Sequence, residues 1–147
     1  MDQLDPPDET IWQERRDWFE TRQAAHAAGG APAPSEQTCA LMIDLQAVFC
    51  AGAWAAAVIL AAAIVESQAR EKGAWRRAES AQPRDKSAVW LHRLRNRLLH
   101  EDKARPVLTV EAQWFQRGQW EDQAKRAVDL AFAALYDRTN PQDEATT

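Results

Sequence analysis

The sequence predicts an all-α protein, a helical bundle of about five helices joined by loops. Apolar residues recur at helical spacing in several segments, no segment alternates as a strand does, and the few Gly and Pro residues stand mainly between these segments. The chain of 147 residues is long enough to bury a sizeable core. Three parts are expected: a helix with a Pro-rich linker over 1–34, a helical domain over 35–137 and a disordered tail over 138–147.

The first helix is expected to begin after Asp8, whose side chain suits an N-cap, and to end near Ala27, before Gly29 and Gly30. Its apolar residues fall at i, i+1, i+7 and i+8, a spacing that predicts one stripe docked on the rest of the protein. The stripe consists of Ile11, Trp12, Trp18 and Phe19.

Ser35 is a suitable cap for a second helix. A bend near Ala51–Gly52 should separate it from a long helix that ends at about Lys72. The expected buried face of the second helix consists of Leu41, Leu45, Val48 and Phe49.

The uncharged run over 47–65 approaches the length of a membrane span, with nineteen residues. Nine of them are alanine, which contributes little to insertion, and Gly52 interrupts the run. Small side chains also let neighbouring helices approach closely. We therefore expect a central helix of the bundle and no membrane association.

The polar stretch 73–86 is expected to form a loop, followed by a helix from Ser87 to about His100. Pro106 excludes a simple continuation and leaves room for one turn after Thr109. The last helix is expected from about Trp120 to Tyr136. Its predicted buried face consists of Ala124, Ala127, Val128, Ala131, Phe132 and Leu135.

Cys39 and Cys50 are the only cysteines. Eleven residues of helix would separate them by about 16 Å, too far for a disulfide, and two buried reduced thiols are typical of a cytoplasmic protein. The acidic start of the chain lacks the apolar region of a signal peptide. These features predict a cytoplasmic location.

Positive charge is concentrated in residues 70–97, which contain nine Lys or Arg against three Asp or Glu, although the whole chain has a net charge of −4. A basic block in an acidic chain favours contact with a polyanion, while a solvated surface kept for solubility is the alternative. Trp75 and Trp90 flank the loop and either stack on bases or belong to the core. The residues expected to bind RNA are Arg76, Arg77, Arg84, Lys86, Arg93 and Arg97.

Arg95 is an unexpected residue on the helix over 87–100. On an ideal helical wheel it falls inside the apolar arc formed by Leu91, Leu94, Leu98 and Leu99. A guanidinium stays charged when buried, so Arg95 requires a carboxylate, a cleft or an anionic ligand. Glu66, at the end of an apolar run, is the natural internal partner.

His92, Asn96 and His100 form a second, polar stripe on the same helix, at i, i+4 and i+8. Two histidines eight residues apart are about 12 Å apart along a helix, and no carboxylate or cysteine completes a set of ligands, so no metal site is expected. Arg95 and His100 are about 140° apart on the wheel. Either the helix distorts near His100, or a second subunit completes the site.

The segment "RNRLLH", Arg95 to His100, resembles the signature of the HEPN superfamily (higher eukaryotes and prokaryotes nucleotide-binding domains): an Arg, four to six residues, then a His, often with a polar residue such as Asn96 directly after the Arg. The preceding segment "GAWAAAVILAAAIVESQARE" resembles an earlier helix of that family, with Glu66 where an acidic residue often occurs. The resemblance covers roughly 35–136.

This resemblance implies a HEPN-like bundle that cleaves RNA without a metal or other cofactor, with an active site at a homodimer interface. His100 would accept or donate a proton, and Arg95 would stabilise charge on the phosphate. Asn96 would position the backbone or the imidazole, and Glu66 would orient Arg95 rather than act as a base. The partners implied are RNA and a protein antitoxin or regulator, in a toxin–antitoxin or phage-defence setting.

Other interpretations remain open for the same residues. Arg95 and Glu66 could form a purely structural ion pair, and His100 could serve only to complement the helix dipole. The domain would then be a non-catalytic HEPN-like module that binds RNA, nucleotide or a protein partner. A small structural dimerisation domain explains the Trp and Ala content but leaves Arg95 without a role.

Overall fold

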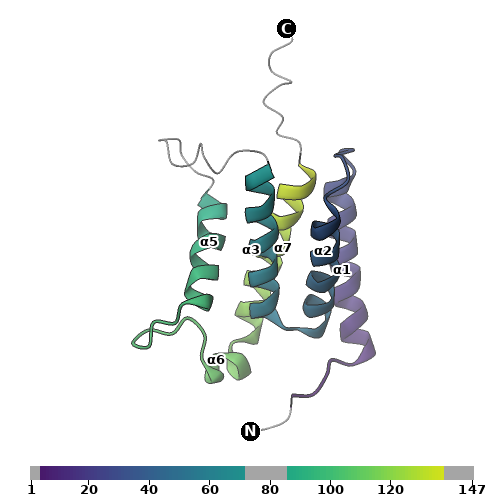
Figure 1. The fold of residues 1–147 in the computed structure, drawn as a ribbon. Coiled ribbons are helices and arrows are strands. Elements are labelled where there is room, and N and C mark those ends of the chain that lie inside the picture. Colours follow the sequence, from purple (N-terminus) through teal and green to yellow (C-terminus); the bar gives the residue numbers. More distant parts are fainter. Residues whose placement is uncertain (1–3, 72–85, 138–147) are drawn as a thin grey trace.

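The computed structural model describes residues 4–71 and 86–137, and this part of the chain contains six helices and no strand. Five long helices, α1 (Glu9–Ala27), α2 (Glu36–Ala51), α3 (Trp54–Glu71), α5 (Lys86–Leu99) and α7 (Arg117–Tyr136), run alternately up and down one bundle, and the short α6 (Val110–Phe115) lies at one end of it (Figure 1). The prediction of an all-α bundle is confirmed.

Helix α1 begins where the sequence indicates, because the Asp8 carboxylate accepts a hydrogen bond of 2.8 Å from the backbone N–H of Ile11. Its aromatic residue Phe19, only 1% exposed, meets Phe132 edge-on at a centroid distance of 5.1 Å and also contacts Phe49. Helix α1 therefore shares one core with the helices after the linker, although the linker suggested a separate part.

The predicted docking stripe of α1 is correct only in its second half. Phe19 is buried and Trp18 stacks on Phe49 at 5.0 Å, whereas Ile11 and Trp12 are each 39% exposed. All four residues lie on neighbouring positions of the same helical face. A face is buried only as far along the helix as its neighbours cover it, and spacing alone does not reveal that length.

Two arginines cover the end of α2, where the chain turns into α3. Gly52 has a φ of +77°, a left-handed conformation that glycine adopts without strain. Arg15 donates to the carbonyl oxygen of Cys50 at 3.1 Å, and Arg117 donates to that of Gly52 at 2.7 Å. Carbonyl groups that lack partners at a helix end are thus paired with cations, which the helix dipole also favours.

Helix α3 is the central helix, and it packs most extensively against α7. Ala57, Ala61 and Ala62 on α3 are fully buried, so small side chains allow the close approach expected for the uncharged run. All six residues predicted for the buried face of α7 are buried. Within the described residues, none of the helices combines the length and the apolar character that crossing a membrane requires.

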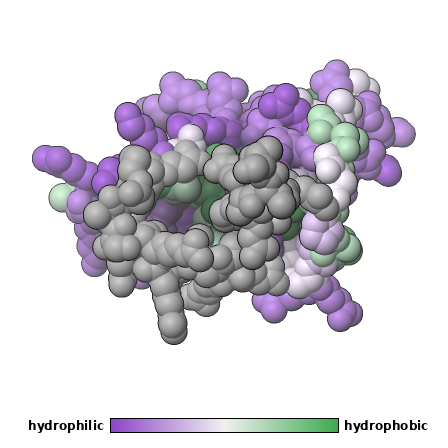
Figure 2. All heavy atoms as spheres, turned by 90° about the horizontal axis from the view of Figure 1, so that it is seen from above, coloured by the Kyte–Doolittle hydropathy of each residue, from purple (hydrophilic) through white to green (hydrophobic). Residues whose placement is uncertain are grey.

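The surface differs from the core in the expected way, with one correction. Viewed along the bundle axis, hydrophilic residues form most of the described periphery and hydrophobic residues lie further inside (Figure 2). Cys50 is buried, but Cys39 is exposed in the first turn of α2, so the expectation of two buried thiols is wrong for Cys39. The expected loop over 73–86, apart from Lys86, and the expected tail over 138–147 lie outside the described residues.

Candidate functional site

Helix α5 carries the motif from Arg95 to Leu99, and His100 follows directly after it. Its apolar face holds it against the bundle through Leu91 and Leu94, which are buried, while Leu98 packs against the edge of the core. Arg95, between these leucines in sequence, retains 30% of its side-chain exposure. The guanidinium is therefore partly withdrawn from water but still reachable from outside.

The carboxylate that Arg95 was expected to require is present. Nη1 of Arg95 lies 3.7 Å from Oε1 of Glu66 on α3. The same nitrogen donates a hydrogen bond of 3.0 Å to Oδ1 of the adjacent Asn96. One hydrogen bond and one ion pair thus hold the guanidinium at the α3–α5 boundary, which limits the conformational freedom of a long side chain.

His92 joins this group, although the sequence analysis named it only as part of a polar stripe. Its Nδ1 lies 3.2 Å from Oε1 of Glu66, and its Nε2 lies 3.1 Å from Nδ2 of Asn96. The amide nitrogen of Asn96 must donate to Nε2, so Nδ1 carries the proton and donates to Glu66. The signal that would have found His92 is its position one turn before Asn96, on the side of α5 that faces α3.

The four side chains form a closed ring, which we call the Glu66 cluster: Glu66, His92, Arg95 and Asn96. Arg95 donates to Asn96, Asn96 donates to His92, and His92 donates to Glu66, which also faces Arg95. Each of the three hydrogen bonds therefore pairs one donor with one acceptor, and the ion pair between Arg95 and Glu66 closes the ring. Three of the four predicted catalytic residues meet in this cluster.

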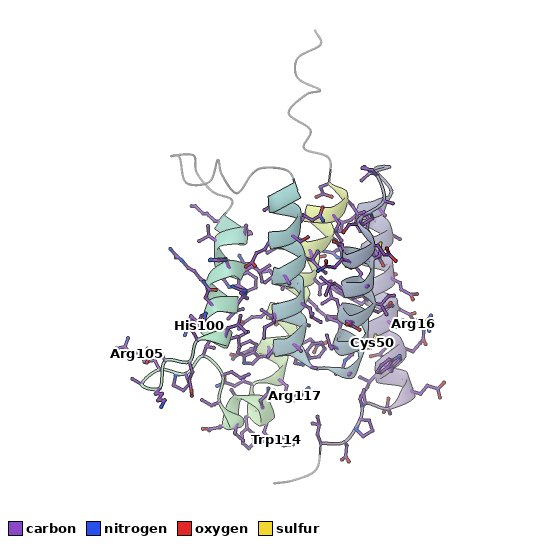
Figure 3. All side chains as sticks on the ribbon, in the orientation of Figure 1. Arg16, Cys50, His100, Arg105, Trp114 and Arg117 are labelled. Atoms are coloured by element: carbon purple, nitrogen blue, oxygen red, sulfur yellow. The ribbon has the colours of Figure 1, made fainter. Side chains whose placement is uncertain are left out.

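The fourth predicted catalytic residue, His100, lies apart from the others. Helix α5 ends at Leu99, and the backbone N–H of His100 donates to the carbonyl of Asn96 at 2.9 Å. The imidazole is exposed at the end of α5 (Figure 3). Within the part of the chain that the structure describes, no hydrogen bond or ion pair joins its side chain to Arg95, as the helical wheel indicates.

The predicted RNA-binding residues that the structure describes lie on another side of α5. Lys86, Arg93 and Arg97 line a groove of about 900 Å³ between α5 and α7, together with Arg126 from α7. The side chains of Arg93 and Arg97 are exposed, and the guanidinium of Arg126 lies over the ring of Trp90 at 4.0 Å. Arg76, Arg77 and Arg84 lie outside the described residues.

The groove and the Glu66 cluster occupy different flanks of one helix. The cluster faces α3, whereas the groove faces α7, and the two sets of residues are separated by roughly a third of a turn on the α5 wheel. His100, at the C-terminal end, falls between them in angle. The sequence indicated both sets of residues but not their separation.

No group of three or more His, Cys, Asp or Glu side chains suited to a metal ion occurs among the residues that the structure describes. No family model matches the chain, and neither a curated protein nor a solved structure matches it. The likeness to HEPN domains therefore depends on the motif and the helices of this chain alone.

Proposed function

We propose that the protein is a metal-independent endoribonuclease of the HEPN type, with an active site composed of residues from two subunits. The observation that carries the proposal is the state of Arg95: its side chain is mostly covered, is oriented by Glu66 and Asn96, and is followed five residues later by an exposed histidine. A preoriented guanidinium is the kind of group that stabilises charge on a phosphate in a transition state.

In the proposed reaction, the 2′-oxygen of the substrate attacks the adjacent phosphorus atom as its hydroxyl proton passes to an imidazole. The bond from phosphorus to the 5′-oxygen breaks, and that oxygen takes up a proton. The products are a 2′,3′-cyclic phosphate and a free 5′-hydroxyl. His100 serves the proton transfers because an imidazole can both accept and donate a proton, and Arg95 neutralises the charge that develops on the phosphoryl oxygens.

In the proposed site, a homodimer brings the histidine of one subunit close to the arginine of the other. Arg95 and His100 point to different sides of α5 in one chain, so a second copy must bring its own histidine to the first copy's arginine. Two identical motif-bearing helices facing each other across a two-fold axis produce two such composite sites.

The direct test is incubation of the purified protein with single-stranded RNA in EDTA. Cleavage is expected for the wild type, with 2′,3′-cyclic phosphate ends and with resistance of a 2′-deoxy substrate. His100→Ala should reduce cleavage by about 10²–10⁴-fold and Arg95→Ala by about 10²–10³-fold. Arg105→Ala, an exposed cation in the loop after α5, is the control and should cleave like the wild type. RNA that stays intact with the wild-type protein contradicts the proposal.

Subunit mixing tests the composite site separately. Arg95→Ala and His100→Ala chains, each inactive alone, should regain about a quarter of wild-type activity when mixed equally, because half of the dimers are mixed and each has one intact site. No recovery after verified subunit exchange would place each site within a single chain.

A second candidate function is a non-catalytic module that binds RNA, nucleotide or a protein partner. The observation in its favour is that Arg95 is already paired with Glu66, an arrangement that also suits a purely structural role. RNA binding without cleavage in the first experiment would favour this alternative.

For a toxin controlled by a protein antitoxin, expression of the wild type alone should arrest growth, and expression of His100→Ala should not.

A further inference from the structure

We propose that the groove between α5 and α7 is the binding track for a single strand of RNA, distinct from the Glu66 cluster on the other flank of α5. The choice of RNA as the ligand rests on the proposed function. The inference that the groove is a binding site rests on its own charges, shape and side chains.

Charge is the first observation. Four of the residues that line the groove are cations, Lys86, Arg93, Arg97 and Arg126, and one described lining residue, Asp122, is a carboxylate. No ion pair with a carboxylate is present for these four cations within the described residues, whereas Arg16 and Arg22 on α1 each pair with an acid. Cations that have no carboxylate partner among the described residues, gathered along one groove, are suited to a polyanionic ligand.

The second observation is a cation–π contact in the groove wall. The guanidinium of Arg126 lies 4.0 Å from the centre of the Trp90 ring. Bases of single-stranded RNA stack on aromatic rings and on guanidinium planes, which a duplex with paired bases cannot do. Gln119 and Gln123 on α7 also line the groove, and their amides supply both donors and acceptors to base edges.

Size and position agree with a strand that passes through the groove. The volume of about 900 Å³ lies near the top of the range for sites that hold a small organic ligand, so it accommodates a short stretch of nucleotides. Arg97 is the last cation of the groove on α5, less than one turn before His100. A strand that leaves the groove over the end of α5 therefore meets the proposed catalytic imidazole.

The binding experiment uses a short, fluorescently labelled, single-stranded RNA with 2′-O-methyl groups, which lacks the attacking hydroxyl. Fluorescence anisotropy is measured over a salt series for the wild type, Arg93→Ala, Arg97→Ala and Arg126→Ala. Each groove variant should bind more weakly and lower the slope of log affinity against log salt by about 0.7. Arg16→Ala is the matched control because it removes one exposed cation on the opposite side of the bundle (Figure 3), and it should leave affinity and slope unchanged.

Three results would overturn the proposal: equal binding by groove variants and wild type, equal binding of a duplex, or competition by a mononucleotide as strong as that by the oligonucleotide. Because these arginines are exposed, their substitution should leave the fold intact. Thermal unfolding of each variant checks that weaker binding is not caused by loss of folding. If binding depends on the groove but the protein never cleaves RNA, the nuclease is refuted and the binding track is supported. If the protein cleaves RNA but binding does not depend on the groove, only the binding track is refuted.

Discussion

Oε1 of Glu66, on α3, lies 3.2 Å from Nδ1 of His92, on α5. This contact and the Arg95 contact of the same carboxylate join two helices that are distant in sequence through polar groups at the edge of the core. Both partners of Glu66 are also bonded to Asn96. The carboxylate is therefore the one member of the cluster that fixes α5 relative to the central helix.

The ion pair between Glu66 and Arg95 is expected to stabilise the fold by about 1 kcal/mol, at the upper end of exposed pairs because both side chains are mostly covered. Urea unfolding of Glu66→Gln, Arg95→Gln and the double variant measures this coupling as a double-mutant cycle. The double variant should lose less stability than the sum of the two single variants. Strictly additive losses would mean that the contact contributes no net stability.

His92, on α5, and His100, directly after α5, are expected to contribute differently to RNA cleavage. His100→Ala should remove a proton-transfer group and lower kcat by about 10²–10⁴-fold. His92 acts through Asn96 and Arg95, so His92→Ala should lower kcat far less. Rescue by His92→Gln would support positioning, because an amide can replace both hydrogen bonds without serving as a base. If His92→Ala equalled His100→Ala and His92→Gln failed to restore activity, His92 itself would be the proton carrier.

Packing of helix α1 against the rest of the bundle is expected to be required for the stability of the fold. Phe19→Ala removes a fully buried ring in contact with Phe49 and Phe132, so unfolding free energy should fall by about 3–5 kcal/mol. Trp12→Ala, on the exposed part of the same face, should cost much less. Chemical denaturation of the two variants measures the difference. Equal losses would contradict the packing of α1 described here.

The two thiols are expected to react at different rates. Burial raises the pKa of the Cys50 thiol, and the nearby Arg16 and Arg15 only partly oppose this effect. A raised thiol pKa leaves less reactive thiolate at neutral pH, and the buried position also blocks access. A maleimide should therefore label Cys39 first, and Cys50 only after unfolding. Cys39→Ser, which leaves Cys50 as the sole thiol, should resist labelling in the native state, and rapid labelling of that variant would contradict the burial of Cys50.

Much of the fold could be predicted because short-range chemistry marks the helix ends. Asp8, Ser35 and Thr109 each accept a backbone hydrogen bond at the start of a helix, and Gly52 adopts the conformation that ends α2. These effects involve residues within one turn of each other. Periodicity also identified the buried face of α7, because α7 crosses the middle of the bundle and is covered along that face.

The candidate site could be predicted only in part. A charge among leucines has few physical solutions, so the partnership of Arg95 with Glu66 followed from burial cost and proximity to the core. The part played by His92 did not follow, because its role depends on how α5 is rotated against α3. The grouping of Lys86, Arg93 and Arg97 with Arg126 required the packing of α5 on α7.

The sequence by itself determined the helices, several of their caps, the buried face of α7 and the need of Arg95 for a partner, because those properties depend on neighbours within a turn and on the cost of desolvation. Only the tertiary structure decided how far α1 is covered, that Cys39 is exposed, and that the Glu66 cluster and the basic groove lie on separate flanks of α5. These properties depend on the rotation and offset of one helix against another, which are settled by the packing of the whole core.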